Sequence, residues 1–179
     1  MSSFAQTLKK FPRLFWISNL IELFERWGWY AFYNGFIALY LTSPKEDGAL
    51  GFTNVEKGTI MGTASMILYF LPVITGAIAD RVGYKKVLIV SFLTYILSFF
   101  MLGRFETFGS IFAAFILLAV AGALFKPLIS GTVARVTNRE TAALGFGIFY
   151  MGGNIGGCIG PFVASLLYKE SWDIVFYMS

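Results

Sequence analysis

Long apolar stretches alternate along the chain with short segments rich in charged residues, glycine and proline. A transmembrane helix needs about 17–25 predominantly apolar residues, so the pattern predicts an all-α, polytopic membrane helix bundle with five full spans and the start of a sixth. The predicted spans are 14–41, 58–79, 87–103, 108–136, 144–168 and, truncated, 172–179. They leave no room for a soluble domain, so residues 1–179 are interpreted as one transmembrane bundle.

The composition and the distribution of basic residues agree with a membrane protein. The chain is 57% hydrophobic and 13% charged, against about 25% charged residues in soluble domains. Its net charge of +4 would indicate a nucleic-acid partner only if the basic residues gathered on one soluble face. Instead they lie between the apolar runs, eight on one side of the membrane and four (Lys45, Lys57, Arg104, Lys169) on the other. The positive-inside rule then places the N-terminus in the cytoplasm.

The first predicted span carries three charges, Glu22, Glu25 and Arg26, inside its apolar run. A charge at the centre of a bilayer costs at least about 2.5–3.5 kcal/mol and faces a protein interior or a cavity. Offsets of three, four, seven or eight, and eleven place a set of polar and aromatic residues on one helix face. That set is Glu22, Glu25, Arg26, Trp29 or Tyr30, and Tyr33. We therefore expect this face to point into the bundle.

Lys126 lies in the middle of the fourth predicted span and needs a partner, because an unpaired buried cation destabilises a fold. The nearest negative charge is that of Glu22 or Glu25. Two carboxylates and two cations sum to zero, so one added proton makes the pocket positive and frees a cation to hold a substrate carboxylate. This is a route to coupled movement of protons and substrate. The alternative is a static ion-pair network that joins the first and fourth spans.

Three further polar side chains, Tyr30, Tyr33 and Asn154, offer hydroxyl and amide groups for a substrate, although each is equally explained by helix packing. Pro72 and two other prolines, Pro127 and Pro161, each remove a backbone hydrogen bond from a predicted helix. They mark either the broken helices that transporters use near the midplane or plain kinks.

No catalytic, cofactor or metal site is predicted. The chain has no histidine, the commonest metal ligand and neutral-pH base. Its one cysteine, Cys158, lies in an apolar glycine-rich segment and supports neither a disulfide nor a metal site. We find no nucleophile–base pair and no glycine-rich phosphate loop, so we do not expect an enzyme.

The turn between the second and third predicted spans contains the sequence GAIADRVGYKK, residues 76–86. It resembles the motif that the major facilitator superfamily carries in the same loop. The resemblance implies the N-terminal six-helix half of that fold, with a C-terminal half as its partner. It also implies that the motif is a conformational latch between the halves. The latch residues would be Gly76, Asp80, Arg81, Gly83, Lys85 and Lys86.

Three stretches are similar to the proton-dependent oligopeptide transporters of that superfamily. Glu22-x-x-Glu25-Arg26, followed by aromatic residues, is close to the family's ExxERFxYY, and Lys126-Pro127 matches its Lys-Pro. The third stretch, Phe149, Tyr150, Asn154 and Gly156 with Pro161, is similar to FYxxINxGS followed by proline. The resemblance implies proton coupling through Glu22, Glu25, Arg26 and Lys126, with peptides as substrate. Tyr33 stands where many members have a basic residue implicated in substrate binding.

A competing pattern lies on the fifth predicted span. Gly147, Gly156 and Gly160-Pro161 fit the antiporter motif of the superfamily, with Ala164 where that motif continues to glycine. Small residues four apart also simply allow helices to pack closely. Together with Pro127, these residues are our candidates for helix packing and hinges.

The combined prediction is a proton-coupled symporter in the plasma membrane, bacterial inner membrane if bacterial. Its substrate would be a small zwitterionic or carboxylate-bearing solute, with di- and tripeptides favoured by the resemblance alone. Two alternatives remain open: a proton-coupled antiporter for drugs or metabolites, and a non-transporting membrane partner or receptor on the same fold. The expected partners are protons, the solute, the lipid bilayer and the C-terminal half.

Overall fold

The computed structural model describes residues 4–34, 36–168 and 172–178, and every regular element among them is a helix. In chain order the elements are α1 (Phe4–Leu8), α2 (Arg13–Trp29), the π-helix η1 (Tyr30–Asn34), α3 (Ile37–Thr42), the 3₁₀ helix η2 (Lys45–Asp47), α4 (Asn54–Phe70), α5 (Pro72–Val82), α6 (Tyr84–Leu102), α7 (Phe108–Val136), α8 (Ala142–Leu167) and α9 (Trp172–Met178). The all-α prediction is confirmed. Lys169 and Ser179, which the sequence predictions used, lie outside the described residues.

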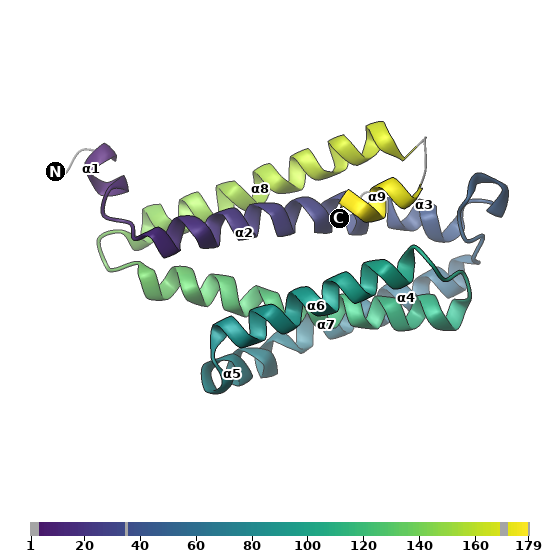
Figure 1. The fold of residues 1–179 in the computed structure, drawn as a ribbon, viewed down its shortest axis with the longest axis horizontal. Coiled ribbons are helices and arrows are strands. Elements are labelled where there is room, and N and C mark those ends of the chain that lie inside the picture. The colour runs from purple at the N-terminus through teal and green to yellow at the C-terminus, as the bar shows by residue number, and fades with distance from the viewer. Residues whose placement is uncertain (1–3, 35, 169–171, 179) are drawn as a thin grey trace.

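The long helices form two groups. In Figure 1, α2 and α8 run side by side, and α6 and α7 run together with α4 on the other side of the bundle. The centre of the bundle is α7, whose side chains are the most continuously buried; they include Ile111, Phe115, Leu118 and Phe125. Because α7 contacts α2, α4, α5, α6 and α8, it sets how the other helices present their polar residues to one another.

Several of the described helices suit a lipid environment. Three of them, α6, α7 and α8, are long and apolar enough to cross a membrane, and the bent pair α4 and α5 is a further candidate. The outward face of α6 is apolar, with Ile89, Leu93 and Ile96 exposed. A long exposed apolar surface of this kind is expected to face lipid. The protein is an integral membrane protein, while the limits of each span within the bilayer stay a prediction.

The three prolines of the predicted spans, Pro72, Pro127 and Pro161, differ in their effect on the helices that contain them. Pro72 interrupts the second predicted span, as expected, because α4 ends at Phe70, α5 begins at Pro72, and their axes differ by 47°. Pro127 and Pro161 instead lie inside α7 and α8, each of which continues as a single helix. The structure therefore shows no break of either helix at these two prolines.

The first predicted span is not one continuous helix. The α-helix ends at Trp29, a π-helical turn covers Tyr30–Asn34, and α3 begins at Ile37. A π-turn is wider than an α-turn and is frequent at functional sites. The break follows directly after the charged residues of α2, so the angular offsets of an ideal helix no longer place Tyr33 relative to Glu22.

Candidate functional site

The charged residues of α2 lie in two adjacent rows, where the sequence pattern predicted one face. One row, Glu22, Arg26 and Tyr30, faces α8; we call it the α8-facing row. The other, Glu25, Trp29 and Tyr33, faces α6 and α4; we call it the α6-facing row. Within α2, the members of each row are four residues apart and lie on the same side of the helix. Tyr30 and Tyr33 belong to the π-turn, and they join the rows through their contacts with Arg26 and Trp29.

The α8-facing row lies against glycines. A Cβ added at Gly153 would lie 3.6 Å from Cγ of Arg26 and 3.7 Å from Oε1 of Glu22. A Cβ at Gly157 would lie 3.3 Å from Cδ2 of Tyr30. Glu22 and Arg26 form an ion pair, Oε1 to Nε, at 3.4 Å, with each side chain 12% exposed. At Gly153 and Gly157, α8 therefore packs against this row without a side chain of its own.

The α6-facing row is held by side chains instead. Both Nε and Nη2 of Arg26 contact Oε2 of Glu25, whose side chain is only 4% exposed. The hydroxyl of Tyr95, on α6, donates to Oε1 of Glu25 at 2.7 Å. Trp29 packs edge-on against Tyr95, and Tyr33 stacks on Trp29 with ring centroids 4.5 Å apart. Both oxygens of Glu25 therefore have donors.

Tyr95 was not predicted from the sequence, although a signal was present. Ser91, Tyr95 and Ser98 are polar residues spaced three or four apart on the otherwise apolar α6, and all three are buried. Ser91 donates to the carbonyl of Ala121 and Ser98 to that of Ala114, both on α7. Such a polar stripe on an apolar helix indicates an interior face.

The expected ion pair of Lys126 is not formed. Among the described residues, the ion pairs of the site join only Arg26 to Glu22 and Glu25. Arg26 thus already serves both carboxylates. Lys126, half-buried on α7, places Nζ 5.4 Å from the ring centroid of Tyr69, a cation–π distance. It still interacts electrostatically with Arg26, Glu25 and Glu22, so all four charges share one neighbourhood.

The predicted substrate residues are dispersed. Tyr30 is half-buried, with the Arg26 guanidinium 5.8 Å from its ring centroid. Tyr33 shares a hydrogen bond of 3.1 Å with Ser65 of α4. Asn154 is exposed on α8. The described chain thus brings Tyr30 close to the charges but gathers no complete substrate site from these residues.

The predicted latch residues lie at one end of α5 and α6. Asp80 forms an ion pair with Arg135 of α7, Oδ1 to Nη2, at 2.8 Å, and accepts a hydrogen bond of 3.1 Å from the hydroxyl of Tyr84. The Arg135 guanidinium lies 4.2 Å from the Tyr84 ring centroid. Gly83 has φ of +102°, a conformation that favours glycine. Arg81, Lys85 and Lys86 are exposed.

The remaining latch and packing residues differ in their contacts. Gly76 packs against Pro127, where an added Cβ would make an ordinary contact of 3.6 Å. A Cβ at Gly156 would clash with the carbonyl oxygen of Leu23, and one at Gly160 with that of Trp27, so α8 touches the α2 backbone at both positions. Gly147 has open space around it.

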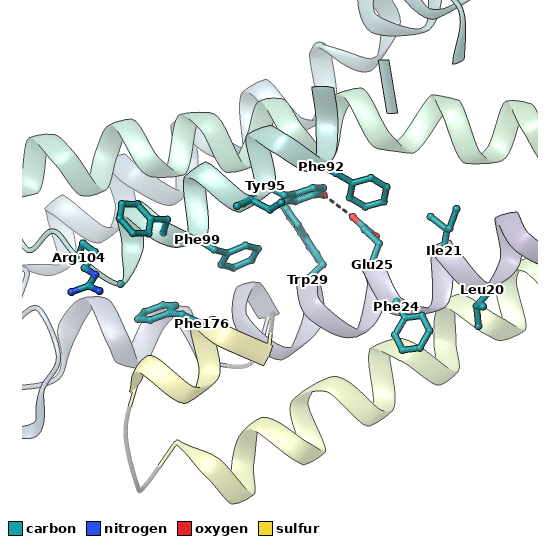
Figure 2. A pocket seen from close by; sticks show the side chains of 13 residues that line it. Leu20, Ile21, Phe24, Glu25, Trp29, Phe92, Tyr95, Phe99, Arg104 and Phe176 are labelled. Atoms are coloured by element: carbon teal, nitrogen blue, oxygen red, sulfur yellow. Dashed lines mark hydrogen bonds between the residues drawn. The ribbon is translucent and has the colours of Figure 1, made fainter. Parts of the chain in front are cut away.

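A cavity of about 610 Å³ opens between α2 and α6. Figure 2 shows Leu20 and Ile21 at one end and Arg104 with Phe176 of α9 at the other, with Glu25 and Tyr95 between them. Its walls are mostly apolar and aromatic. Of the predicted site residues it is lined by Glu25, and Tyr30, Tyr33, Lys126 and Asn154 lie outside its lining. We therefore do not assign it to the substrate.

Comparison with known proteins finds relatives that are named as permeases or transporters. The family described as Major Facilitator Superfamily matches residues 15–179. Over 176 residues the chain is 28% identical to dipeptide and tripeptide permease A of Yersinia pestis, covering 95% of this chain and 34% of the relative. Over 162 residues it is 27% identical to the uncharacterized transporter YclF of Bacillus subtilis, covering 89% and 33%. The chain thus spans about a third of the length of these curated relatives.

A solved structure shows the same fold. The crystal structure of a peptide transporter, POT, in complex with sulfate aligns with a TM-score of 0.85 and 23% identity. The alignment covers 99% of this chain and 36% of that chain. The arrangement of helices described above is therefore that of the matching third of a full-length transporter structure.

Proposed function

The chain belongs to the major facilitator superfamily, and from this we propose that it is the N-terminal part of a proton-coupled symporter. The solute we propose is small and zwitterionic or carboxylate-bearing, with di- and tripeptides favoured. The observation that carries the proposal is the cluster of two carboxylates sharing one guanidinium, Glu22 and Glu25 with Arg26. The name of one relative, dipeptide and tripeptide permease A, supports the peptide substrate.

The coupling follows from the charges. Glu22, Glu25, Arg26 and Lys126 together carry no net charge when all are ionised. A proton on Glu22 weakens its 3.4 Å pairing with Arg26 and leaves the cluster at +1. A substrate carboxylate then restores neutrality by binding near Arg26 and Lys126. Loss of the proton returns Arg26 to Glu22 and favours substrate release.

The roles of the other predicted residues complete the proposal. Tyr30, Tyr33 and Asn154 offer polar groups to the solute, while the motif from Gly76 to Lys86 acts as a latch at the cytoplasmic side. The ion pair from Asp80 to Arg135 supports a role in fixing α5 against α7. Gly156 and Gly160 let α8 and α2 approach closely, and Gly147, Pro127 and Pro161 are candidate adjustment points. A C-terminal half would complete the transport path.

The test is uptake of a radiolabelled dipeptide by the full-length protein in proteoliposomes, with and without an inward proton gradient. We expect the gradient to accelerate uptake and Glu22→Gln to remove that acceleration. Uptake that ignores both the gradient and the substitution would contradict the symporter. Efflux of a dye driven by the same gradient would favour the antiporter, and no transport in either assay would favour a non-transporting partner.

A further inference from the structure

We propose that Tyr95 of α6 is a positioning residue for proton coupling: its hydroxyl fixes Glu25 as the anchor of Arg26 and leaves Glu22 as the carboxylate that exchanges the proton. This inference rests on the proposed function and assigns a role to a residue of α6, the third predicted span.

The geometry around Glu25 is that of a fully engaged carboxylate. Tyr95 donates to Oε1 at 2.7 Å, and Arg26 contacts Oε2 through two nitrogens. Figure 2 shows the Tyr95 hydroxyl pointing at the carboxylate across the space between α6 and α2. Tyr95 is 8% exposed and the Glu25 side chain 4%. A proton on Glu25 would displace one of these two donors from the carboxylate.

Glu22 is held much less firmly. Among the described residues, its one ion pair is the 3.4 Å contact with Arg26, one turn along the same helix. The charges acting on it are those of Arg26, Glu25 and Lys126, from α2 and α7. At this level α8 presents Gly153, so a glycine and not a hydrogen-bonding side chain lies beside the carboxylate. A proton on Glu22 therefore costs one weak contact and releases part of Arg26, while the Tyr95–Glu25 bond keeps Arg26 in position.

The surroundings of Tyr95 fix the direction of its hydroxyl. Its ring lies between Trp29, with centroids 6.4 Å apart, and Phe99, also at 6.4 Å. Opposite the hydroxyl, α7 has Gly122, where an added Cβ would lie 3.2 Å from Tyr95 Oη and 2.9 Å from Cδ1 of Leu68. Glycine at this position leaves the space through which the phenol reaches Glu25.

A similar arrangement occurs at the end of α6 where the latch residues lie. There the Tyr84 hydroxyl donates to Asp80, and α7 again has a glycine opposite, Gly131, where a Cβ would lie 2.8 Å from Tyr84 Oη. In both places a tyrosine of α6 uses a glycine of α7 to reach a carboxylate that also pairs with an arginine. The exposed site at Asp80 joins helices of the bundle, whereas the buried site at Glu25 touches the proposed coupling cluster.

The test compares Tyr95→Phe with a matched substitution, Tyr40→Phe, in the full-length protein in proteoliposomes. Tyr40 lies on α3, and its buried hydroxyl donates to the carbonyl of Leu102 on α6 at 2.9 Å, so both substitutions remove one buried phenol hydrogen bond that involves α6. Two rates are measured with the same labelled dipeptide: uptake driven by a proton gradient, and counterflow exchange with no gradient. The pH profile of driven uptake is the third measurement.

For Tyr95→Phe we expect driven uptake to fall about tenfold, the effect of losing a hydrogen bond to a charged group, while counterflow stays within about twofold. We expect its pH midpoint to move by about one unit and that of Tyr40→Phe to stay unchanged. Equal effects of the two substitutions, or a parallel fall of driven uptake and counterflow in Tyr95→Phe, would overturn the positioning role. Absence of driven uptake in the native protein would overturn the proposed function and this role together.

Discussion

The two rows of α2 differ in what holds them. The α8-facing row (Glu22, Arg26, Tyr30) lies against glycines, and Glu22 is tied by one contact of 3.4 Å. The α6-facing row lies against side chains, where Glu25 is tied by Arg26 and Tyr95, and Tyr33 by Ser65. Two carboxylates three positions apart along the helix, Glu22 and Glu25, thus differ in how firmly their partners hold them.

The difference indicates how a membrane helix can combine stability with switching. Buried charges need partners, and leaving one unpaired is strongly destabilising. The α6-facing row meets this requirement with a fixed network, which allows the α8-facing row to keep a carboxylate whose pairing is weak. Arg26 belongs to both, because it contacts Glu25 and Glu22.

Removal of Arg26 should disrupt the ion pairs of both rows and cause the largest loss of stability and of driven uptake. Arg26→Ala leaves Glu22 and Glu25 without their shared cation, and breaking a buried pair in this way costs about 3–5 kcal/mol. We expect a large fall in the melting temperature of the purified full-length protein and loss of driven uptake. The control, Arg104→Ala, removes an exposed arginine and should change stability by about 0.5 kcal/mol or less. Similar melting temperatures for the two variants would contradict the central role of Arg26.

Neutralising each carboxylate separately should distinguish the rows. In Glu25→Gln an amide NH₂ group would face either Tyr95 or Arg26, both of which donate to Glu25 in the native protein. We therefore expect the free energy of unfolding to fall by about 1.5–3 kcal/mol. Glu22→Gln keeps an oxygen that can accept from Arg26 across the one long contact, so it should cost less, about 0.5–1.5 kcal/mol. Thermal unfolding of the two variants measures the difference. If Glu22→Gln were the less stable of the two, Glu25 would not be the more firmly held carboxylate, and the proposed roles of the two rows would be wrong.

The sequence predicted part of this site well. Charges in an apolar run must face the interior, and this places Glu22, Glu25 and Arg26 in the bundle without any structure. The superfamily motif around Asp80 and the polar-apolar pattern also predicted the all-α membrane fold that the structure confirms.

The division into rows could not be predicted, because it depends on how α2 is rotated against its neighbours. Offsets of three and four residues are compatible with both rows, and only the contacts of Gly153 and Tyr95 separate them. The π-turn after Trp29 also moves Tyr33 away from the position that an ideal helix gives it. Lys126 was expected to bind a carboxylate, but Arg26 already pairs with both carboxylates, and the lysine lies over Tyr69 instead.

The close approach of α8 to α2 gives a third way to disturb the α8-facing row. In Gly160→Ala the new methyl group would meet the carbonyl oxygen of Trp27, part of a backbone that moves only with its helix. We expect overpacking to cost about 1–3 kcal/mol and to lower driven uptake. Gly147→Ala is the matched control on the same helix, since nothing lies near its Cβ, and it should be neutral or slightly stabilising. Equal melting temperatures would show that the contact at Gly160 does not limit packing.

The smallest effect should come from the two tyrosines at the ends of the rows. Tyr33→Phe removes the hydrogen bond to Ser65 and should cost about 0.5–1.5 kcal/mol. For Tyr30 the structure shows no hydroxyl hydrogen bond among the described residues, so Tyr30→Phe should leave the melting temperature unchanged. Because we propose that the Tyr30 hydroxyl serves the solute, Tyr30→Phe should raise the KM for dipeptide uptake. A lower melting temperature of Tyr30→Phe without a change in KM would mean that the Tyr30 hydroxyl stabilises the fold and does not bind the solute. The α8-facing row would then be held as firmly as the α6-facing row at this position, and the two rows would differ only at Glu22 and Glu25.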